Sequence, residues 1–139
     1  MITGLSHVTL VVRDLSRAAA LLTGALDARE IFSSGDKTFS LSREKFFLVG
    51  NLWLCLMEGE PPAERGYAHV ALEAPEAELD GYRARLAASG AEIRPDRPRI
   101  GAEGRSVYFY DFDNHLFELH AGSLKTRLAG YKAATGEEN

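Results

Sequence analysis

Two histidines and one glutamate are the residues of this sequence best suited to bind a metal ion. His7 and His69 stand at matching places in the similar runs 5–12 and 67–74, and Glu118 stands among apolar residues. An ionised carboxylate buried without a partner costs several kcal/mol, so something positive should face it. Two imidazoles and a carboxylate bind divalent first-row metals and leave coordination positions open for water or ligand oxygens. We therefore predict a metal site with these three residues as ligands.

Each of these residues also has an ordinary structural interpretation. A lone histidine on an apolar strand is more often a core residue than a ligand, and Glu118 could form a salt bridge or lie on an exposed edge strand. Cys55 is a further candidate ligand, since a thiolate would close the site with four protein ligands. Because Trp53 and Met57 flank it on the same face, we expect Cys55 to pack as a small hydrophobe. The matching places of the two histidines favour the metal site.

The clearest local pattern is a hairpin from Ser106 to His120. Aromatic and β-branched residues precede the turn signal Asp113-Asn114, and an alternating apolar pattern follows it. Because side chains alternate across a strand, Glu118 shares a face with His120, which we expect beside the site but not as a ligand. His115 lies at the turn and is also expected to be a non-ligand.

The elements that position these residues occur twice in the same order: strand, helix and three strands. In the first copy we expect strands at 5–12, 29–34, 38–41 and 52–57 and a helix from 15 to about 26, with charged residues 42–45 leading into the apolar residues 46–49. In the second we expect strands at 67–74 and 91–94, a helix at 75–90 and the hairpin. This repeat predicts an α+β fold of two βαβββ modules, about 1–60 and about 66–122, in a single domain over 1–139. A C-terminal helix is expected at about 123–132.

Aligning the two final turns on Asn51 and Asn114 sets Cys55 opposite Glu118. The first copy therefore lacks the carboxylate that the second copy has.

Composition excludes several classes of protein. A content of 45% hydrophobic and 26% charged residues in 139 residues predicts one folded domain with a substantial core. The net charge of −4 argues against a nucleic-acid binder, and the apolar runs are too short to span a membrane. The single cysteine excludes an internal disulfide, and the first residues lack the pattern of a signal peptide, so we expect a cytoplasmic protein.

Five segments resemble the fosfomycin-resistance proteins of the vicinal oxygen chelate (glyoxalase/bleomycin resistance/dioxygenase) superfamily, over residues 1 to about 130. They are Gly4-Leu-Ser-His-Val-Thr9, Asn51-Leu-Trp-Leu-Cys-Leu56, Tyr67-Ala-His69, Ser106-Val-Tyr-Phe-Tyr-Asp-Phe-Asp-Asn-His-Leu-Phe-Glu-Leu-His120 and Gly122-Ser-Leu-Lys-Thr-Arg-Leu128. The hydrolase branch, the FosX-type proteins, is the most similar, through Phe39-Ser-Leu-Ser-Arg-Glu-Lys-Phe-Phe47 and through Arg97-Pro-Arg99 with Glu103-Gly-Arg-Ser106.

The resemblance implies a Mn2+-dependent epoxide hydrolase that hydrates the oxirane ring of fosfomycin to a diol. It implies a homodimer in which paired modules complete each site, with the metal as Lewis acid and Glu44 as general base. Without the resemblance, Glu44 would be interpreted as a solvated loop charge between Arg43 and Lys45. Other divalent metals remain possible cofactors.

The phosphonate of such a substrate needs cations and hydroxyl groups. The candidates for substrate binding are Thr9, Tyr67, Arg99, Ser106, Tyr108 and Arg127, with Phe46 and Trp53 on the apolar side of the cavity. The loop register leaves open whether Arg97 or Arg99 contacts the phosphonate.

The alternative function within the family is a thiol transferase that adds glutathione or another cellular thiol to fosfomycin. Those branches lack the insertion 42–45, and residues 100–104 lack the polar pattern of a potassium-binding loop, so neither potassium nor a thiol cosubstrate is expected. A binding protein that sequesters a small molecule, and an isomerase or ring-cleaving dioxygenase on the same scaffold, are further alternatives.

Overall fold

A computed structural model describes residues 1–97 and 104–136, and it contains two four-stranded sheets of identical topology. The strands of the first sheet, in the order β1-β4-β3-β2, are β1 (His7–Val12), β2 (Arg29–Ser33), β3 (Glu44–Val49) and β4 (Leu52–Glu58). Those of the second, in the order β5-β8-β7-β6, are β5 (His69–Glu73), β6 (Glu92–Ile93), β7 (Arg105–Tyr110) and β8 (Leu116–Ala121). In each sheet the first strand runs parallel to the last, and the other pairings are antiparallel. The predicted pair of βαβββ modules is therefore confirmed.

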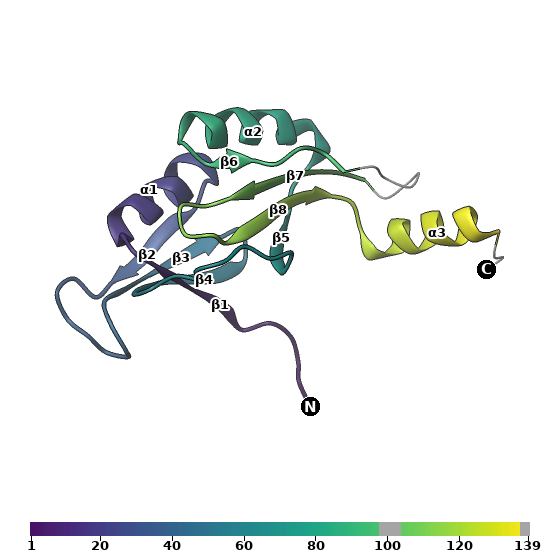
Figure 1. The fold of residues 1–139 in the computed structure, drawn as a ribbon. Coiled ribbons are helices and arrows are strands. Elements are labelled where there is room, and N and C mark those ends of the chain that lie inside the picture. Colours follow the sequence, from purple (N-terminus) through teal and green to yellow (C-terminus); the bar gives the residue numbers. More distant parts are fainter. Residues whose placement is uncertain (98–103, 137–139) are drawn as a thin grey trace.

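Each module carries one helix on its sheet. Helix α1 (Leu15–Ala25) begins at Asp14, whose carboxylate accepts a hydrogen bond from the backbone N–H of Arg17 at 3.0 Å. The short 3-10 helix η1 (Glu76–Glu78) leads into α2 (Leu79–Ala88), and α1 and α2 contact each other (Figure 1). Among the described residues no helix combines the length and the apolar composition that a membrane crossing requires.

The third helix, α3 (Leu124–Thr135), continues from the end of β8 and projects away from both sheets (Figure 1). It begins at a capping box formed by Ser123 and Thr126 and buries none of its residues. The helix ends at Gly136 in a left-handed conformation, so it extends a few residues beyond the predicted end at 132.

One hydrophobic core joins the helix-bearing faces of the two sheets. Phe47 and Leu54 enter it from the first sheet, and Phe109 and Phe117 enter it from the second with their rings stacked at 5.2 Å. Each such fully buried side chain contributes roughly 1.5–3 kcal/mol to stability. Because strand side chains alternate, the opposite face of each sheet is left for the polar and aromatic residues of the candidate site.

The strand predicted at 38–41 is wrong. The β2–β3 hairpin closes where the backbone N–H of Ser34 donates to the carbonyl of Glu44 and the N–H of Glu44 donates to Ser34 Oγ, both at 3.0 Å. Residues between them form a connecting loop, in which Phe39 and Leu41 are 67% and 87% exposed. Glu44 is thus the first residue of a strand rather than a loop charge.

Candidate active site

The face of the first sheet that points away from the core carries half of the predicted site. The parallel pairing of β1 with β4 sets His7 beside Trp53 and Thr9 beside Cys55, and β3 sets Phe46 beside Cys55. The ring of Trp53 lies 4.3 Å from that of His7 and 5.2 Å from that of Phe46. We call this face half-site one; its residues are His7, Thr9, Glu44, Phe46, Trp53 and Cys55.

Within half-site one, Glu44 is buried and paired with the thiol of Cys55. The Glu44 residue is 7% exposed, and Cys55 Sγ donates to its Oε2 across 3.7 Å. Burial, followed by the negative charge of Glu44, raises the pKa of Cys55 to about 11. Cys55 is therefore a buried thiol that keeps its proton at physiological pH in this structure, which fits the predicted packing as a small hydrophobe.

The outward face of the second sheet holds two predicted metal ligands side by side. His69 Nε2 lies 3.1 Å from Glu118 Oε1, and His69 Nδ1 lies 2.7 Å from the backbone carbonyl of Tyr67. A carbonyl only accepts, so the Nδ1 atom carries a proton. Nε2 then faces a carboxylate oxygen, and two acceptor atoms at this distance need a cation between them, either a proton or a metal ion. The donor atoms therefore fit a shared metal ion.

A directed chain of hydrogen bonds supports Glu118. Arg127 Nη2 lies 3.1 Å from His120 Nε2, His120 Nδ1 lies 2.7 Å from Ser106 Oγ, and Ser106 Oγ donates to Glu118 Oε2 at 2.5 Å. Arginine only donates and a carboxylate only accepts, so the protons run from Arg127 toward Glu118 and His120 is neutral with its proton on Nδ1. Burial acts to raise the pKa of Glu118, but hydrogen bonds from Ser106 and Tyr108 hold it below its usual value.

This series of hydrogen bonds contains contacts that the sequence did not predict. Ser106, predicted to bind substrate, donates its hydroxyl hydrogen bond to Glu118 instead. His120, predicted only to lie beside the site, connects α3 to that carboxylate. The contact between His120 and Arg127 crosses the junction of β8 and α3, and the strand periodicity that located Glu118 gives no signal beyond the end of the strand.

The tyrosines and arginines near β7 lie on the same face. Tyr67 Oη donates to Tyr108 Oη at 3.4 Å, and burial raises the pKa of Tyr108 while a hydrogen bond with Arg97 lowers it. Arg97 thus reaches this face, whereas Arg99 lies outside the described residues. We call the face half-site two; its residues are Tyr67, His69, Ser106, Tyr108, Glu118, His120 and Arg127.

One chain does not bring the two half-sites together. His7 belongs to the first sheet, and His69 and Glu118 belong to the second. Among residues 1–97 and 104–136, no group of three or more His, Cys, Asp or Glu side chains is arranged to hold a metal ion. His7 and His69 are both exposed, and so is Thr9. Each half-site therefore presents its ligands to the outside of the chain.

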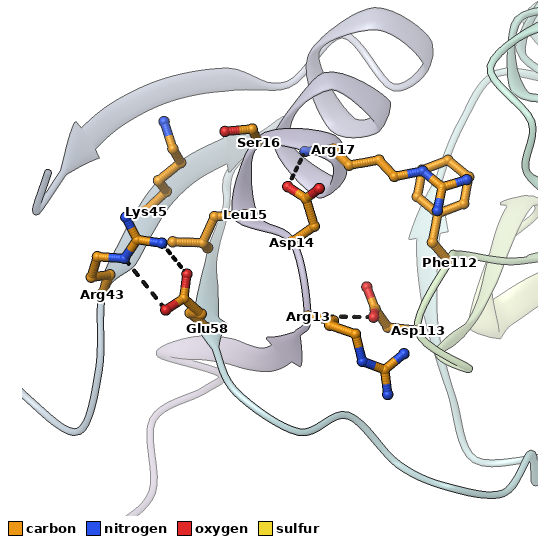
Figure 2. Close-up of a pocket in the computed structure, with 10 residues that line it drawn as sticks. All are labelled: Arg13, Asp14, Leu15, Ser16, Arg17, Arg43, Lys45, Glu58, Phe112 and Asp113. Carbon is orange, nitrogen blue, oxygen red and sulfur yellow. Dashed lines mark hydrogen bonds and ion pairs between the residues drawn. The ribbon is translucent and has the colours of Figure 1, made fainter. Parts of the chain in front are cut away.

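A separate hollow of about 550 Å³ lies beside the start of α1 (Figure 2). Its positive side chains already have partners: Arg43 forms an ion pair with Glu58, and the guanidinium of Arg17 lies 3.7 Å from the ring centre of Phe112. No histidine and no predicted site residue lines it. This hollow is not the candidate site.

Comparison with known proteins identifies the family. The model of the Glyoxalase/Bleomycin resistance protein/Dioxygenase superfamily matches residues 4–119. Fosfomycin resistance protein FosX of Listeria innocua is 57% identical over 131 residues, which cover 94% of this chain and 98% of that protein. Metallothiol transferase FosB of Shouchella clausii is 34% identical, over 95% of this chain and 89% of that protein.

A solved structure gives the same result. A variant of FosX from Listeria monocytogenes, complexed with Mn(II) and 1S,2S-dihydroxypropylphosphonic acid, is 53% identical and superposes with a TM-score of 0.86. The match covers 94% of this chain and 99% of that one. This chain therefore belongs to the glyoxalase/bleomycin resistance protein/dioxygenase superfamily and, within it, to the FosX fosfomycin-resistance proteins.

Proposed function

We propose that this protein is a Mn2+-dependent epoxide hydrolase that adds water to the oxirane ring of fosfomycin. The observation that carries the proposal is the place of Glu44, a buried carboxylate on the same sheet face as His7 and Thr9. A second support is the ligand of the FosX relative from Listeria monocytogenes, which is a dihydroxypropylphosphonic acid. A diol is the product expected when water, rather than a thiol, opens the ring.

Glu44 is the general base in this reaction. Its carboxylate accepts a proton from the attacking water as the water oxygen bonds to an oxirane carbon. The bond between that carbon and the ring oxygen breaks, and the ring oxygen takes up a proton from solvent to give the second hydroxyl. Glu44 then returns its proton to solvent, so the net change is the addition of one water. Phe46 and Trp53 lie beside Glu44 on the same sheet face and limit the access of bulk water.

His7, His69 and Glu118 are the residues that would hold the manganese ion. The facing acceptor atoms of His69 and Glu118 fit a cation, and the Nδ1 of His7 is 3.0 Å from Ser6 Oγ, which leaves its Nε2 for the metal. When bound, the metal supplies Lewis-acid stabilisation of the charge that develops on the departing oxygen. The proposed ligand set accommodates other divalent ions as well.

The phosphonate is bound by donors from both half-sites. Arg127 provides donors from half-site two, since its guanidinium has donor hydrogens besides the one directed at His120. Tyr108 and Thr9 stay predicted contacts, because their hydroxyl groups hydrogen-bond Glu118 and Cys55 in this structure. Arg97 joins them through its contact with Tyr108, while Arg99 stays a prediction.

A second copy of the chain completes each site, so the protein is a homodimer. The arrangement of the ligands on two separate sheets supports this proposal, because half-site one of one chain can face half-site two of its partner. Exposed apolar side chains near both ends of the chain could be buried in the same dimer interface. Ile2 and Leu5 are 94% and 73% exposed, and Leu124 on α3 is 74% exposed. The buried free thiol of Cys55 fits the reducing cytoplasm, where we place the protein.

Phosphorus NMR of fosfomycin incubated with the purified protein tests the reaction. With Mn2+ and no thiol, the native protein should produce the diol, whereas Glu44→Gly should produce none and still bind the metal. Diol formation by Glu44→Gly would remove Glu44 from its role. A thiol adduct formed only when glutathione or another thiol is added would support the transferase alternative instead.

Subunit complementation tests the shared site. His7→Ala and His69→Ala should each be inactive alone, because every site then lacks a ligand. After equal mixing and subunit exchange, half of the dimers carry one variant of each kind, and one of their two sites is intact, so about a quarter of native activity should return. If the mixture stayed inactive after proven exchange, each chain would have to build its own site.

A further inference from the structure

Glu44 has one carboxylate oxygen with a partner and one without. Oε2 accepts a hydrogen bond from the thiol of Cys55, and this is the only side-chain hydrogen bond to the Glu44 carboxylate among the described residues. Of the buried side-chain nitrogen and oxygen atoms in residues 1–97 and 104–136, only Trp53 Nε1 lacks a partner. Among the described residues Glu44 Oε1 has no hydrogen-bond partner, and since it is not one of the fully buried unpaired atoms, it keeps some contact with the surface. The two oxygens of the Glu44 carboxylate therefore have different surroundings: Oε2 is hydrogen-bonded to Cys55, and Oε1 is not hydrogen-bonded to any described residue.

The charges next to Glu44 do not hold its carboxylate. Arg43 is paired with Glu58, and Lys45 Nζ is paired with Glu30 Oε1 at 2.8 Å. The remaining contact of Glu44 with Ser34 is made by its backbone. A glutamate side chain has three rotatable bonds, so fixing its end requires a contact to the carboxylate itself.

We infer that Cys55 is a positioning residue, whose thiol holds Glu44 Oε2 so that Oε1 faces the attacking water. The inference rests on the proposed function, because it gives Cys55 a role in the reaction that assigns Glu44 as base. General-base catalysis needs the acceptor atom within hydrogen-bond reach of the water, so a carboxylate that rotates freely loses rate rather than affinity.

The thiol is suited to this task over the working range of pH. The pKa of Cys55 is raised to about 11, above the ordinary value of 9.0, so the sulfur keeps its proton below that pH and remains a donor. A hydrogen bond with Thr9 acts on the same sulfur and connects it to β1. The thiol is also a weak donor, which leaves the carboxylate able to accept a proton.

The second module contains the same geometry with the roles exchanged. In the first sheet Glu44 lies opposite Met57 and Cys55 lies opposite Phe46, so Glu44 and Cys55 form a diagonal pair across β3 and β4. In the second sheet Ser106 lies opposite His120 and Glu118 lies opposite Tyr108, which makes Ser106 and Glu118 the equivalent diagonal across β7 and β8. Ser106 holds Oε2 of Glu118 at 2.5 Å and leaves Oε1 facing His69. One donor therefore orients one carboxylate in each module.

Steady-state kinetics of fosfomycin hydration by the Mn2+-loaded full chain tests the inference. Cys55→Ala should lower kcat by about tenfold, the value of one hydrogen bond to a charged group, with KM for fosfomycin changed by less than about twofold. Cys55→Ser keeps a donor and should restore kcat to within about threefold of native.

A matched variant separates positioning from packing. Val11→Ala removes apolar volume from the same face of β1, opposite Met57, and takes no hydrogen bond from Glu44. It should keep the native kcat and the native KM for fosfomycin. If Val11→Ala lowered kcat as much as Cys55→Ala does, or if Cys55→Ser were as slow as Cys55→Ala, the effect would be one of packing and the inference would be wrong.

An infrared measurement tests the contact without catalysis. The chain has one cysteine, so its S–H stretch is a single band in a region that is free of other protein bands. Glu44→Gln replaces the charged acceptor by a neutral one and should move this band toward the frequency of a free thiol. A band that stays unchanged in Glu44→Gln would show that the thiol does not donate to Glu44. Failure of the proposed function is recognised separately, since the native protein would then form no diol while the infrared shift would remain.

Discussion

The two modules place a carboxylate and its donor on the same diagonal of the same sheet topology, and they use them differently. Glu44 on β3 accepts a hydrogen bond from the thiol of Cys55 on β4. Glu118 on β8 accepts one from the hydroxyl group of Ser106 on β7. The hydroxyl donor favours the ionised carboxylate that a metal ligand must be, and a thiol is the weaker donor. A carboxylate that has to accept a proton needs the weaker donor, because a strong hydrogen bond would stabilise its ionised form. Because the two sheets share one topology, the donor rather than the backbone distinguishes the proposed base from the proposed ligand.

The neighbours of the two carboxylates differ in the same direction. The residue opposite Cys55 is Phe46, and the residue opposite Glu118 is Tyr108, whose hydroxyl group contacts the carboxylate. Half-site one thus combines the proposed base with an apolar wall, and half-site two combines two of the proposed metal ligands with donors for an anion. Neither module alone holds both sets, which is why the proposed reaction needs the two faces to meet.

Glu118→Gln should give the largest effect, because it removes the charged ligand of half-site two. We expect the affinity for Mn2+, measured by electron paramagnetic resonance of the free ion, to fall by more than the roughly 10–100-fold typical of residues that only support a ligand. Glu44→Gln is the matched control, an acid changed in the other module, and should bind Mn2+ as the native protein does. Equal losses in the two variants would end the distinction between the two carboxylates.

Ser106→Ala should give the next largest effect. It removes the donor to Glu118 Oε2 and the acceptor of His120, so we expect the affinity for Mn2+ to fall by roughly 10–100-fold. Ser40→Ala, in the exposed loop before β3, is the control and should bind like native. An unchanged affinity in Ser106→Ala would mean that the hydroxyl serves the substrate rather than the ligand.

Arg127→Ala should act on substrate binding when Mn2+ is saturating, a condition that is needed because Arg127 also begins the hydrogen-bond chain to Glu118. Loss of its guanidinium should raise KM for fosfomycin by about tenfold, the cost of one contact to a charged group, while kcat changes little. Steady-state kinetics at saturating Mn2+ measures both constants. A fall in kcat with an unchanged KM would move Arg127 from the phosphonate to the reacting atoms.

The order of the strands along the sequence and the faces of their side chains could be predicted, because apolar and polar residues alternate within the strands. The repeat of that pattern in the sequence is enough to place His7, His69 and Glu118 on outward faces. The strand predicted at 38–41 failed because local alternation does not show which partner a segment has, and here Ser34 pairs with Glu44 instead. Residue types and spacing predicted that the three ligands meet, and only the resemblance implied that paired modules of a homodimer complete each site. The topology puts the three residues on two sheets of one chain.

The turns of the two final hairpins offer the smallest and cleanest comparison. Gly50 has a φ of +57° between β3 and β4, and Asn114 has a φ of +67° between β7 and β8. A Cβ added at Gly50 would meet nothing within 4 Å, so any cost of Gly50→Ala is one of backbone conformation, about 1 kcal/mol. Gly50→Asn should cost less, because asparagine tolerates the left-handed region, as Asn114 does in the longer turn of the second module. Urea unfolding measures both, and equal losses in the two variants would show that the first turn does not accept the chemistry of the second.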